Sequence, residues 1–360
     1  MAQQVALVVG SGSLDSPGGV EAACRALVKL LRGLGYETRY ISSSELVAAS
    51  AFRGLPGRRA WWGVAEVLAV RSFDRRADIV VTNGPIGWGL RGKHRSVHYY
   101  HGTYVGQAEA IRPWIKRRGY AKMRYLDGMV LERLAGQGKA CVTCSDLVSR
   151  EVKRWFGYDA PPVYHVVDCA VFRPGPPDSD VRERLGVTRA KPVGLFVGVG
   201  RPVKNEHAAF QVAETTAHVI EWVAVGEHPV ITPPKGLRIM PRVPPEVMPK
   251  LLRSVDLVLA PSRYDSFSFL VAETLACGTP VISTRQTGSA TLLMGEGVLG
   301  SWLVDSDDVK SMSQAALRIA ADPGAARAVA MEGRARVEAT LTFEAWASRF
   351  VDATGIEAIC

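Results

Sequence analysis

Two cations follow a glycine-rich strand end in the second half of the chain. The segment GLFVGVGRPVKN reads as a buried strand ending near Gly198 and Gly200, with Arg201 and Lys204 just beyond it. Open α/β sheets bind ligands at the carboxyl edge of their strands, so both cations are expected at that edge. Glycines let the backbone approach a ligand closely, and cations stabilise charge growing on a leaving group. The pattern indicates a diphosphate site, although a solvated loop would carry the same residues.

Two carboxylates flank the start of an apolar helix further along the chain. Asp265 and Glu273 are eight residues apart in PSRYDSFSFLVAE, and Glu273 is expected to open the helix that continues through AETLACG. Backbone N–H groups near a helix start bind anions; here they belong to Phe269, Leu270 and Val271. Carboxylates accept paired hydrogen bonds from vicinal diols. The segment therefore indicates an anion site flanked by hydroxyl-binding carboxylates, the alternative being a loop aspartate and a helix-capping glutamate.

A third glycine-rich segment, GSGSLDSPGGVE, follows the first apolar run. Gly18 and Gly19 are expected to begin a helix and to place backbone N–H groups against a phosphate. The segment fails as a dinucleotide fingerprint, because Asp15 stands where the third glycine after Gly10 and Gly12 belongs. A nicotinamide-dependent dehydrogenase is therefore disfavoured.

Apolar runs of strand length alternate with amphipathic segments of helix length, which indicates parallel strands joined by crossover helices. In the first half, strands are expected at 5–10, 37–42, 78–84, 96–102, 139–145 and 163–167, with helices at 19–35 and 145–157. In the second half, strands are expected at 193–198, 219–226, 237–241, 256–262 and 280–284, with helices at 205–217, 245–255, 268–278, 308–322, 324–339 and 343–355.

A stretch rich in proline, glycine and acidic residues, VFRPGPPDSD, reads as a linker between two such arrangements. We therefore predict an α/β protein with two Rossmann-like, doubly wound domains that face a central cleft. Residues 1–170 would form an acceptor-binding domain and residues 171–342 a donor-binding domain. Residues 343–360 would form a helix crossing back to the first domain.

Composition limits the classes of protein. The chain has 360 residues, 47% of them hydrophobic, and no apolar run long enough to cross a bilayer, so a globular protein is expected. The N-terminal residues read as a strand and not as a signal peptide. The six scattered cysteines are expected to be reduced thiols, and Cys141 and Cys144 to be buried strand residues, with zinc or redox chemistry as the minor alternative.

The residues quoted above resemble the family 4 glycosyltransferases. The resemblance covers almost the whole chain and is strongest over VGRPVKN, over LRSVDLVLAPSRYDSFSFLVAETLACGTPVIST, and over the loop with Gly18 and Gly19. It implies the GT-B fold, a nucleotide-sugar donor and retention of anomeric configuration.

The resemblance also implies residue roles. Arg201 and Lys204 would bind the donor diphosphate, Glu273 the ribose, and Asp265 the transferred sugar. Gly19 would meet the diphosphate from the other domain. His101, in YYHGT, would lie near the sugar. The complete expected donor set is Gly18, Gly19, Gly200, Arg201, Lys204, Asn205, Phe269, Leu270, Val271 and Glu273.

Some positions depart from the family pattern. The family usually has glutamate where Asp265 stands, so this carboxylate is one methylene shorter. Arg201 and Lys204 are closer in sequence than is common in the family, so Asn205 is also considered as a donor-binding residue. These differences leave the base and sugar of the donor open, with UDP-, GDP- and dTDP-sugars all considered.

No side chain is placed as a nucleophile, so front-face substitution without a metal or other cofactor is expected. Two Asp-x-Asp sequences could instead bind a metal, namely Asp178–Asp180 in the linker and Asp305–Asp307. Both are interpreted as cap or loop residues, with the second capping the helix at 308–322.

The acceptor domain is strongly basic. Residues 1–160 contain 24 Lys and Arg against 13 Asp and Glu, and the segment from Ile111 to Gln137 holds Trp114 beside Lys116, Arg117 and Arg118. One hypothesis is peripheral docking on an anionic membrane to reach a lipid-linked acceptor. The other is a soluble hydroxyl acceptor, such as a metabolite or natural product, with solvated charges. Nucleic acid is not expected as a partner. The protein is expected to be cytoplasmic.

Two other functions remain open at this point. A non-catalytic module that binds sugar nucleotides would fit the shortened carboxylate at Asp265, and a sugar-nucleotide epimerase of the same fold is the nearest enzymatic alternative.

Overall fold

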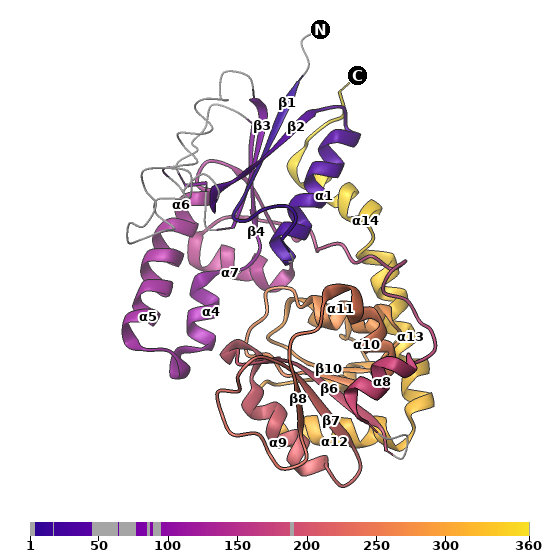
Figure 1. Cartoon of the computed structure of the whole chain (residues 1–360). Coiled ribbons are helices and arrows are strands. Elements are labelled where there is room, and N and C mark those ends of the chain that lie inside the picture. Colours follow the sequence, from indigo (N-terminus) through magenta and orange to yellow (C-terminus); the bar gives the residue numbers. More distant parts are fainter. Residues whose placement is uncertain are drawn as a thin grey trace. The chain divides into compact units, whose positions relative to one another are not determined.

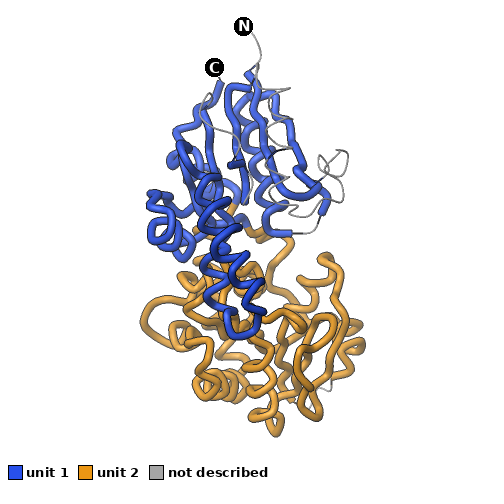
Figure 2. The backbone as a smooth tube through the Cα atoms, turned by 90° about the vertical axis from the view of Figure 1, so that its left-hand side faces the viewer, with its two compact units in different colours: residues 1–166, 343–360 blue, residues 167–342 orange. Residues whose placement is uncertain are grey.

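The computed structural model describes residues 4–16, 18–44, 64, 77–84, 87–88, 95–187 and 191–359. All the Lys and Arg residues from position 53 to position 93, and Cys360, lie outside these ranges. The chain divides into two compact units, Met1–Val166 with Phe343–Cys360, and Val167–Thr342 (Figure 2). The sequence placed the corresponding breaks at 170/171 and 342/343.

Unit 1 is built on a parallel sheet with the order β2-β1-β3-β4-β5 among its described strands (Figure 1). The central strands are buried apolar runs, as strands covered on both faces should be. The order reverses between β1 and β3, so the loops after these strands diverge at that point. The strands are β1 Val5–Gly10, β2 Glu37–Ser42, β3 Ala77–Asn83, β4 Arg95–Tyr100 and β5 Ala140–Thr143.

Helices on both sides complete unit 1. Helix α7 is capped by Ser145, whose side chain accepts the Val148 N–H, and ends at Gly157 with a positive φ of 83°, as the sequence predicted. Helix α14 packs into this unit: the Phe350 ring lies 6.2 Å from that of Tyr99. The helices are α1 Gly19–Gly33, α4 Tyr104–Ala110, η1 Arg112–Trp114, α5 Arg117–Ala121, the π-helix η2 Lys122–Glu132, α6 Arg133–Gly136, α7 Asp146–Phe156 and α14 Phe343–Thr354.

The strand expected at 163–167 does not form. Thr143 and Pro162 make an isolated bridge, and the Val167 N–H then turns to the carbonyl of Leu341 at 2.8 Å. The Val163 carbonyl then accepts from the Tyr99 hydroxyl, so the pairing with β5 ends after this one bridge.

Unit 2 contains a second parallel sheet, with the order β11-β10-β9-β6-β7-β8 among described strands. The order reverses between β6 and β9, so the segments after these two strands share the crevice where doubly wound sheets bind ligands. The strands are β6 Val193–Val199, β7 Glu221–Gly226, β8 Arg238–Met240, β9 Leu257–Ala260, β10 Val281–Thr284 and β11 Leu303–Val304.

The helices of unit 2 cover both faces of this sheet (Figure 1). They are α8 Ser179–Leu185, η3 Pro202–Lys204, α9 Glu206–Thr216, η4 Pro245–Val247, α10 Met248–Ser254, α11 Phe269–Ala276, η5 Gly288–Leu292, η6 Leu299–Trp302, α12 Val309–Ala321 and α13 Pro323–Thr340.

Candidate active site

The loop after β6 depends on two glycines for its shape. Gly198 has φ 131°, and a Cβ there would stand 2.6 Å from Cγ of Lys204. Gly200 has φ 80°, and a Cβ there would stand 2.6 Å from the carbonyl oxygen of His228. Side chains at either position would push the loop away, so the glycines allow Lys204 to lie across the strand end. Arg201 is exposed and forms no ion pair with a described residue.

Lys204 and Asp265 meet at the switch point between β6 and β9. Lys204 Nζ lies 2.5 Å from Asp265 Oδ2, with both side chains more than four-fifths buried. The Asp265 backbone bonds to Gln286 and Gly288, which fixes its position beside β10. Burial raises the pKa of the Asp265 carboxyl, but the Lys204 ammonium, aided by Ser268, holds it below its usual value. The carboxylate is therefore ionised at neutral pH.

Helix α11, Phe269–Ala276, lies within the range 268–278 expected for it, but it starts four residues before Glu273, which was expected to open it. It starts at Phe269, so Glu273 lies inside the helix and does not open it. The first residues Phe269, Leu270 and Val271 present the N–H groups that have no carbonyl partner within the helix. Burial raises the pKa of the Glu273 carboxyl to about 7, so near neutral pH it titrates.

Two groups expected at the donor site are already bonded within unit 2. The Gly200 N–H donates to Glu206 Oε2 at 2.6 Å. Asn205 caps α9 through Ala208, and its Nδ2 donates to the Ser306 carbonyl at 2.7 Å. The donor roles of Gly200 and Asn205 stay predictions, and they would require these bonds to rearrange.

Glu206 is a residue that sequence reasoning missed. Its buried carboxylate also accepts the N–H groups of Val230 at 2.5 Å and Ile231 at 3.1 Å. It thereby ties the loop after β6 to the loop after β7. An isolated glutamate at a helix start gives no local signal for such a role, because its partners lie 24 and 25 residues away in sequence.

Replacing Glu206 by alanine should destabilise the protein by roughly 2–4 kcal/mol, because three N–H groups lose a charged acceptor. Affinity for a nucleoside diphosphate should fall as well, since the loop carrying Arg201 and Lys204 loses its tie. Thermal unfolding and calorimetric titration measure both effects. Glu214→Ala, an exposed position on the same helix, is the control and should change neither; equal behaviour of the two variants would refute the role.

In unit 1, helix α1 begins at Gly19 with Gly18 as its N-cap, as the sequence predicted. The Glu21 carboxylate lies against this loop, and a Cβ on Gly18 would clash with it. A phosphate approaching the helix start would meet that negative charge, so we expect Glu21 to turn aside when one binds.

His101 directly follows β4 and bonds to Asn83, the last residue of β3. Its Nε2 lies 2.8 Å from Asn83 Oδ1, while Asn83 Nδ2 donates to the Val9 carbonyl. This second bond orients the amide oxygen toward the ring, so Nε2 carries the proton and the buried Nδ1 is an acceptor with no partner among described residues. Burial, followed by the stacked ring of His165 at 5.1 Å, lowers the pKa of His101 well below 6.5. The ring is neutral at physiological pH.

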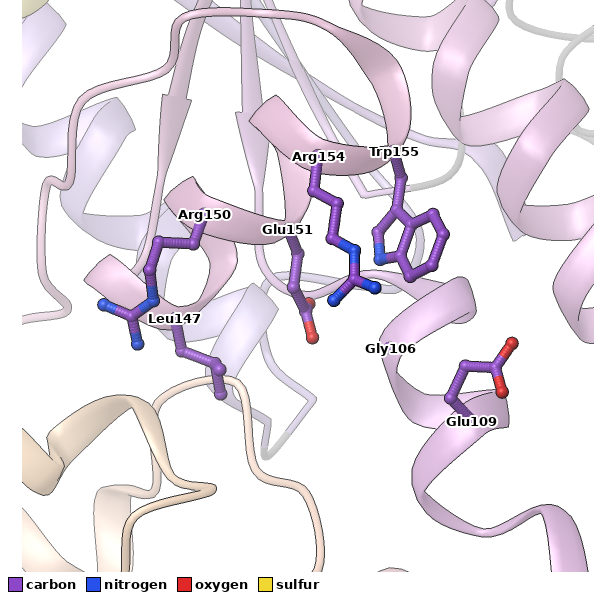
Figure 3. A pocket seen from close by; sticks show the side chains of 7 residues that line it. All are labelled: Gly106, Glu109, Leu147, Arg150, Glu151, Arg154 and Trp155. Atoms are coloured by element: carbon purple, nitrogen blue, oxygen red, sulfur yellow. The ribbon is translucent and has the colours of Figure 1, made fainter.

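A pocket of about 700 Å³ lies between α4 and α7 of unit 1 (Figure 3). Glu151 accepts a 2.6 Å hydrogen bond from Thr103, which caps α4 and stands two residues after His101. Glu109 pairs with Arg124, whereas the pocket's arginines form no ion pair with described residues. The lining residues are Gly106, Glu109, Leu147, Arg150, Glu151, Arg154 and Trp155.

Aspartates of the two Asp-x-Asp sequences cap a helix or lie near arginines. Asp178 caps α8 through Val181, as interpreted from the sequence. Helix α12 is capped by Asp308 and not by Asp305–Asp307; Asp305 and Asp307 instead lie near Arg285 and Arg263. Cys141 lies in β5 and Cys144 directly follows it; both are buried thiols, as predicted, and burial raises the pKa of Cys141 to about 11.

Two models of known families match consecutive parts of the chain. The model described as Glycosyltransferase Family 4 matches residues 17–171, and the model described as Glycosyl transferases group 1 matches residues 191–322. Similar curated proteins include the D-inositol 3-phosphate glycosyltransferase of Xylanimonas cellulosilytica, 26% identical over 226 residues, or 57% of this chain and 54% of that protein. The protein of the same name from Acidothermus cellulolyticus is 31% identical over 180 residues, which are 44% of this chain and 39% of that protein. The chain thus spans about half the length of these relatives, or less.

Similar solved structures extend over nearly the whole chain. Sucrose-phosphate synthase from Thermosynechococcus elongatus gives a TM-score of 0.78 at 19% identity, covering 97% of this chain and 98% of that one. HepE of Anabaena, solved with UDP-glucose, gives a TM-score of 0.70 at 13% identity, covering 98% of this chain and 100% of that one. These likenesses and the two sheets confirm the predicted GT-B fold of two Rossmann-like domains. With both halves matched in order by models of the same enzyme group, the chain belongs to the family 4 glycosyltransferases.

Proposed function

We propose that this chain transfers a sugar from a nucleotide-sugar donor to a hydroxyl acceptor, with retention of configuration and without a metal. The observation that carries the proposal is the Lys204–Asp265 pair at the β6/β9 switch point, beside the start of α11. This arrangement puts a cation, helix N–H groups and an ionised carboxylate at the edge where such sheets bind ligands.

Each part has a chemical role in the proposal. Arg201, Lys204 and the start of α11 bind the diphosphate, Glu273 binds the ribose, and Asp265 binds a hydroxyl of the transferred sugar. The neutral His101 accepts a hydrogen bond near the sugar through Nδ1. Its role is positioning, because a ring with so low a pKa is a poor proton donor at neutral pH.

The reaction proceeds on one face of the sugar. The bond between the anomeric carbon and the phosphate oxygen breaks, the acceptor oxygen bonds to that carbon, and the leaving phosphate takes the acceptor's proton. Arg201, Lys204 and the helix N–H groups hold the charge that develops on the phosphate. These groups supply positive charge without a metal.

The acceptor side is proposed to include the pocket of Figure 3. Glu151, which lines this pocket, accepts a hydrogen bond from Thr103, two residues after His101 in the sequence. Carboxylates suit hydroxyl groups, and Arg150 and Arg154 suit an anionic group, with Arg154 held over the Trp155 ring at 4.6 Å. A phosphorylated polyol is therefore the first acceptor class to test, and the curated relatives' name includes such a compound.

The test is product formation from a panel of UDP-, GDP-, ADP- and dTDP-sugars. Transfer with release of nucleoside diphosphate, unaffected by a chelator, is expected, and the product anomer should match the donor. Binding without release would favour a non-catalytic module. Conversion of the donor sugar without transfer would favour an epimerase, and loss of activity with a chelator would exclude the metal-free mechanism.

We also propose that unit 1 docks on an anionic membrane surface. Trp114, Leu126 and Val130 are each at least 45% exposed along η1 and η2. Lys116, Arg117 and Arg118 are exposed beside them and form no ion pair with described residues. Apolar side chains next to unneutralised cations are typical of interfacial segments. No helix among the described residues is long and apolar enough to cross a membrane.

Vesicle cosedimentation tests this surface. The protein should bind vesicles containing anionic lipid at low salt and dissociate at high salt. Changing Lys116, Arg117 and Arg118 to glutamate should weaken binding about 100-fold or more, at about 1 kcal/mol per cation. The same reversal at Arg184, Lys310 and Arg318 of unit 2 is the matched control. Equal loss in both triple variants, or no binding at low salt, would leave the soluble-acceptor hypothesis.

A further inference from the structure

Ser268, the residue before α11, has a backbone conformation that favours glycine. Its φ is 67° and its ψ is 78°, and Asn205 is the other non-glycine residue with positive φ in the part of the chain that the structure describes. Asparagine visits this left-handed region readily, whereas serine does so less often. A glycine at position 268 would hold the same backbone without strain.

The side chain adds a second unfavourable feature. Ser268 is 3% exposed, and its Oγ is buried without a hydrogen-bond partner among described residues. It lies near the Asp265 carboxylate and helps to lower the pKa of that group. A buried hydroxyl that lacks a partner is destabilising. Strain and an unpartnered hydroxyl therefore coincide in one residue.

The residue's surroundings indicate what the hydroxyl is for. Its own N–H donates to Asp265 Oδ1 at 2.9 Å, and Asp265 Oδ2 pairs with Lys204. The phosphate-binding groups in the proposed function are Arg201, Lys204 and the helix N–H groups, all donors. The carboxylate of Asp265 is an acceptor only. A hydroxyl beside it can both donate and accept, which suits a second sugar hydroxyl or ring oxygen.

We propose that the Ser268 hydroxyl contacts the transferred sugar beside Asp265 and contributes to the choice of donor. The inference rests on the proposed function, because it places the sugar at Asp265. Strained backbone persists where a ligand contact offsets it, and such residues cluster at ligand sites. The contact forms only when the donor is bound, so the free protein carries both unfavourable features.

Two substitutions separate the hydroxyl from the backbone. Ser268→Gly removes the hydroxyl and the strain, whereas Ser268→Ala removes the hydroxyl and keeps the strain. The glycine variant should unfold about 2–4 °C higher than wild type, and higher than the alanine variant. Ser313→Ala in α12 removes another buried, unpartnered hydroxyl and is the matched control, which should leave donor binding unchanged.

Calorimetric titration then compares each nucleoside diphosphate with its sugar. For the nucleotide sugar that wild type binds most tightly, both Ser268 variants should bind roughly 5–30-fold more weakly, while affinity for the nucleoside diphosphate alone is unchanged. Discrimination between donors that differ in one hydroxyl configuration, such as UDP-glucose and UDP-galactose, should shrink toward equality when UDP is the base bound.

The outcomes are distinct. Unchanged nucleotide-sugar affinity in a glycine variant that unfolds at higher temperature would overturn the assignment and leave Ser268 as a strained residue with no ligand role. If the variants bind the nucleoside diphosphate alone more weakly by the same factor, the hydroxyl contacts the phosphate and the assignment to the sugar is also overturned. If the wild-type protein binds no nucleotide sugar in the panel, both the proposed function and the Ser268 inference fail. If the wild-type protein transfers sugar and both Ser268 variants bind the donor as tightly as it does, only the Ser268 inference fails.

Discussion

Replacing Lys204 by alanine should lower the rate of sugar transfer by about 100- to 1000-fold, the range seen when one charge-stabilising group is removed from a transition state. The leaving diphosphate loses its buried cation, and Arg201 is too exposed to replace it. The rate is measured as release of nucleoside diphosphate at saturating donor and acceptor.

The same substitution changes stability in a way that depends on pH. Asp265 would stay buried without its partner, and breaking a buried pair costs at most about 3–5 kcal/mol. In wild type the depressed pKa of Asp265 stabilises the protein above its usual titration range, and this stability is lost as pH falls. In Lys204→Ala burial dominates and raises that pKa, so the variant should gain stability as pH falls from neutral. Thermal unfolding across pH measures this reversal.

A second substitution separates the two effects. Lys204→Ala with Asp265→Asn removes the uncompensated charge, so it should recover most of the lost stability without recovering transfer. Recovery of both would show that Lys204 acts by neutralising Asp265 alone, and would refute a role at the diphosphate.

Replacing Glu273 by glutamine should stabilise the protein at pH 8 and weaken donor binding. Burial raises the pKa of this carboxyl from 4.5 to about 7, so the folded state disfavours its charge. A raised acid pKa means that stability is highest at low pH and falls as pH rises through 7. The difference of about 2.5 units corresponds to at most roughly 3 kcal/mol in favour of glutamine at pH 8, and it should vanish toward pH 4.5.

Donor binding should move in the opposite direction. Two ribose hydroxyls donating to one group need the ionised carboxylate, so wild-type affinity should rise as pH increases from 6 to 8. Glu273→Gln should bind nucleoside diphosphate about tenfold more weakly at pH 8, with little pH dependence. Glu332→Gln, on the exposed face of α13, is the control and should match wild type in stability and affinity. A glutamine variant at 273 that binds as tightly as wild type would disprove the ribose contact.

Much of the architecture followed from local pattern. Buried strands such as Val5–Gly10 and Val193–Val199 are continuous apolar runs, and Ser145 and Gly157 mark the ends of α7 by their chemistry alone. Predictions were wrong where partners were distant. The segment 163–167 has strand-forming residues, but the Tyr99 hydroxyl binds its first carbonyl and its last N–H bonds to the carbonyl of Leu341, away from the sheet.

The site shows the same division. Residue types and spacing along the chain singled out Arg201, Lys204, Asp265 and Glu273 as candidates, because charge next to glycine or to a helix start is a local feature. Their states depend on the fold. Lys204 is paired because strand order places the ends of β6 and β9 together, and Glu273 titrates near neutrality because α11 buries it.

The sequence by itself determined the fold class, the loop between β6 and α9 as a place for cations, and the acidic residues around α11, since these depend on periodicity and on residue chemistry. Only the tertiary structure decided which of these groups are engaged. It committed the Gly200 N–H to Glu206 and the Asn205 amide to Ser306, and it left the strained Ser268 with a buried hydroxyl. Hydrogen bonding and burial join residues that are far apart in sequence, so no local pattern contains them.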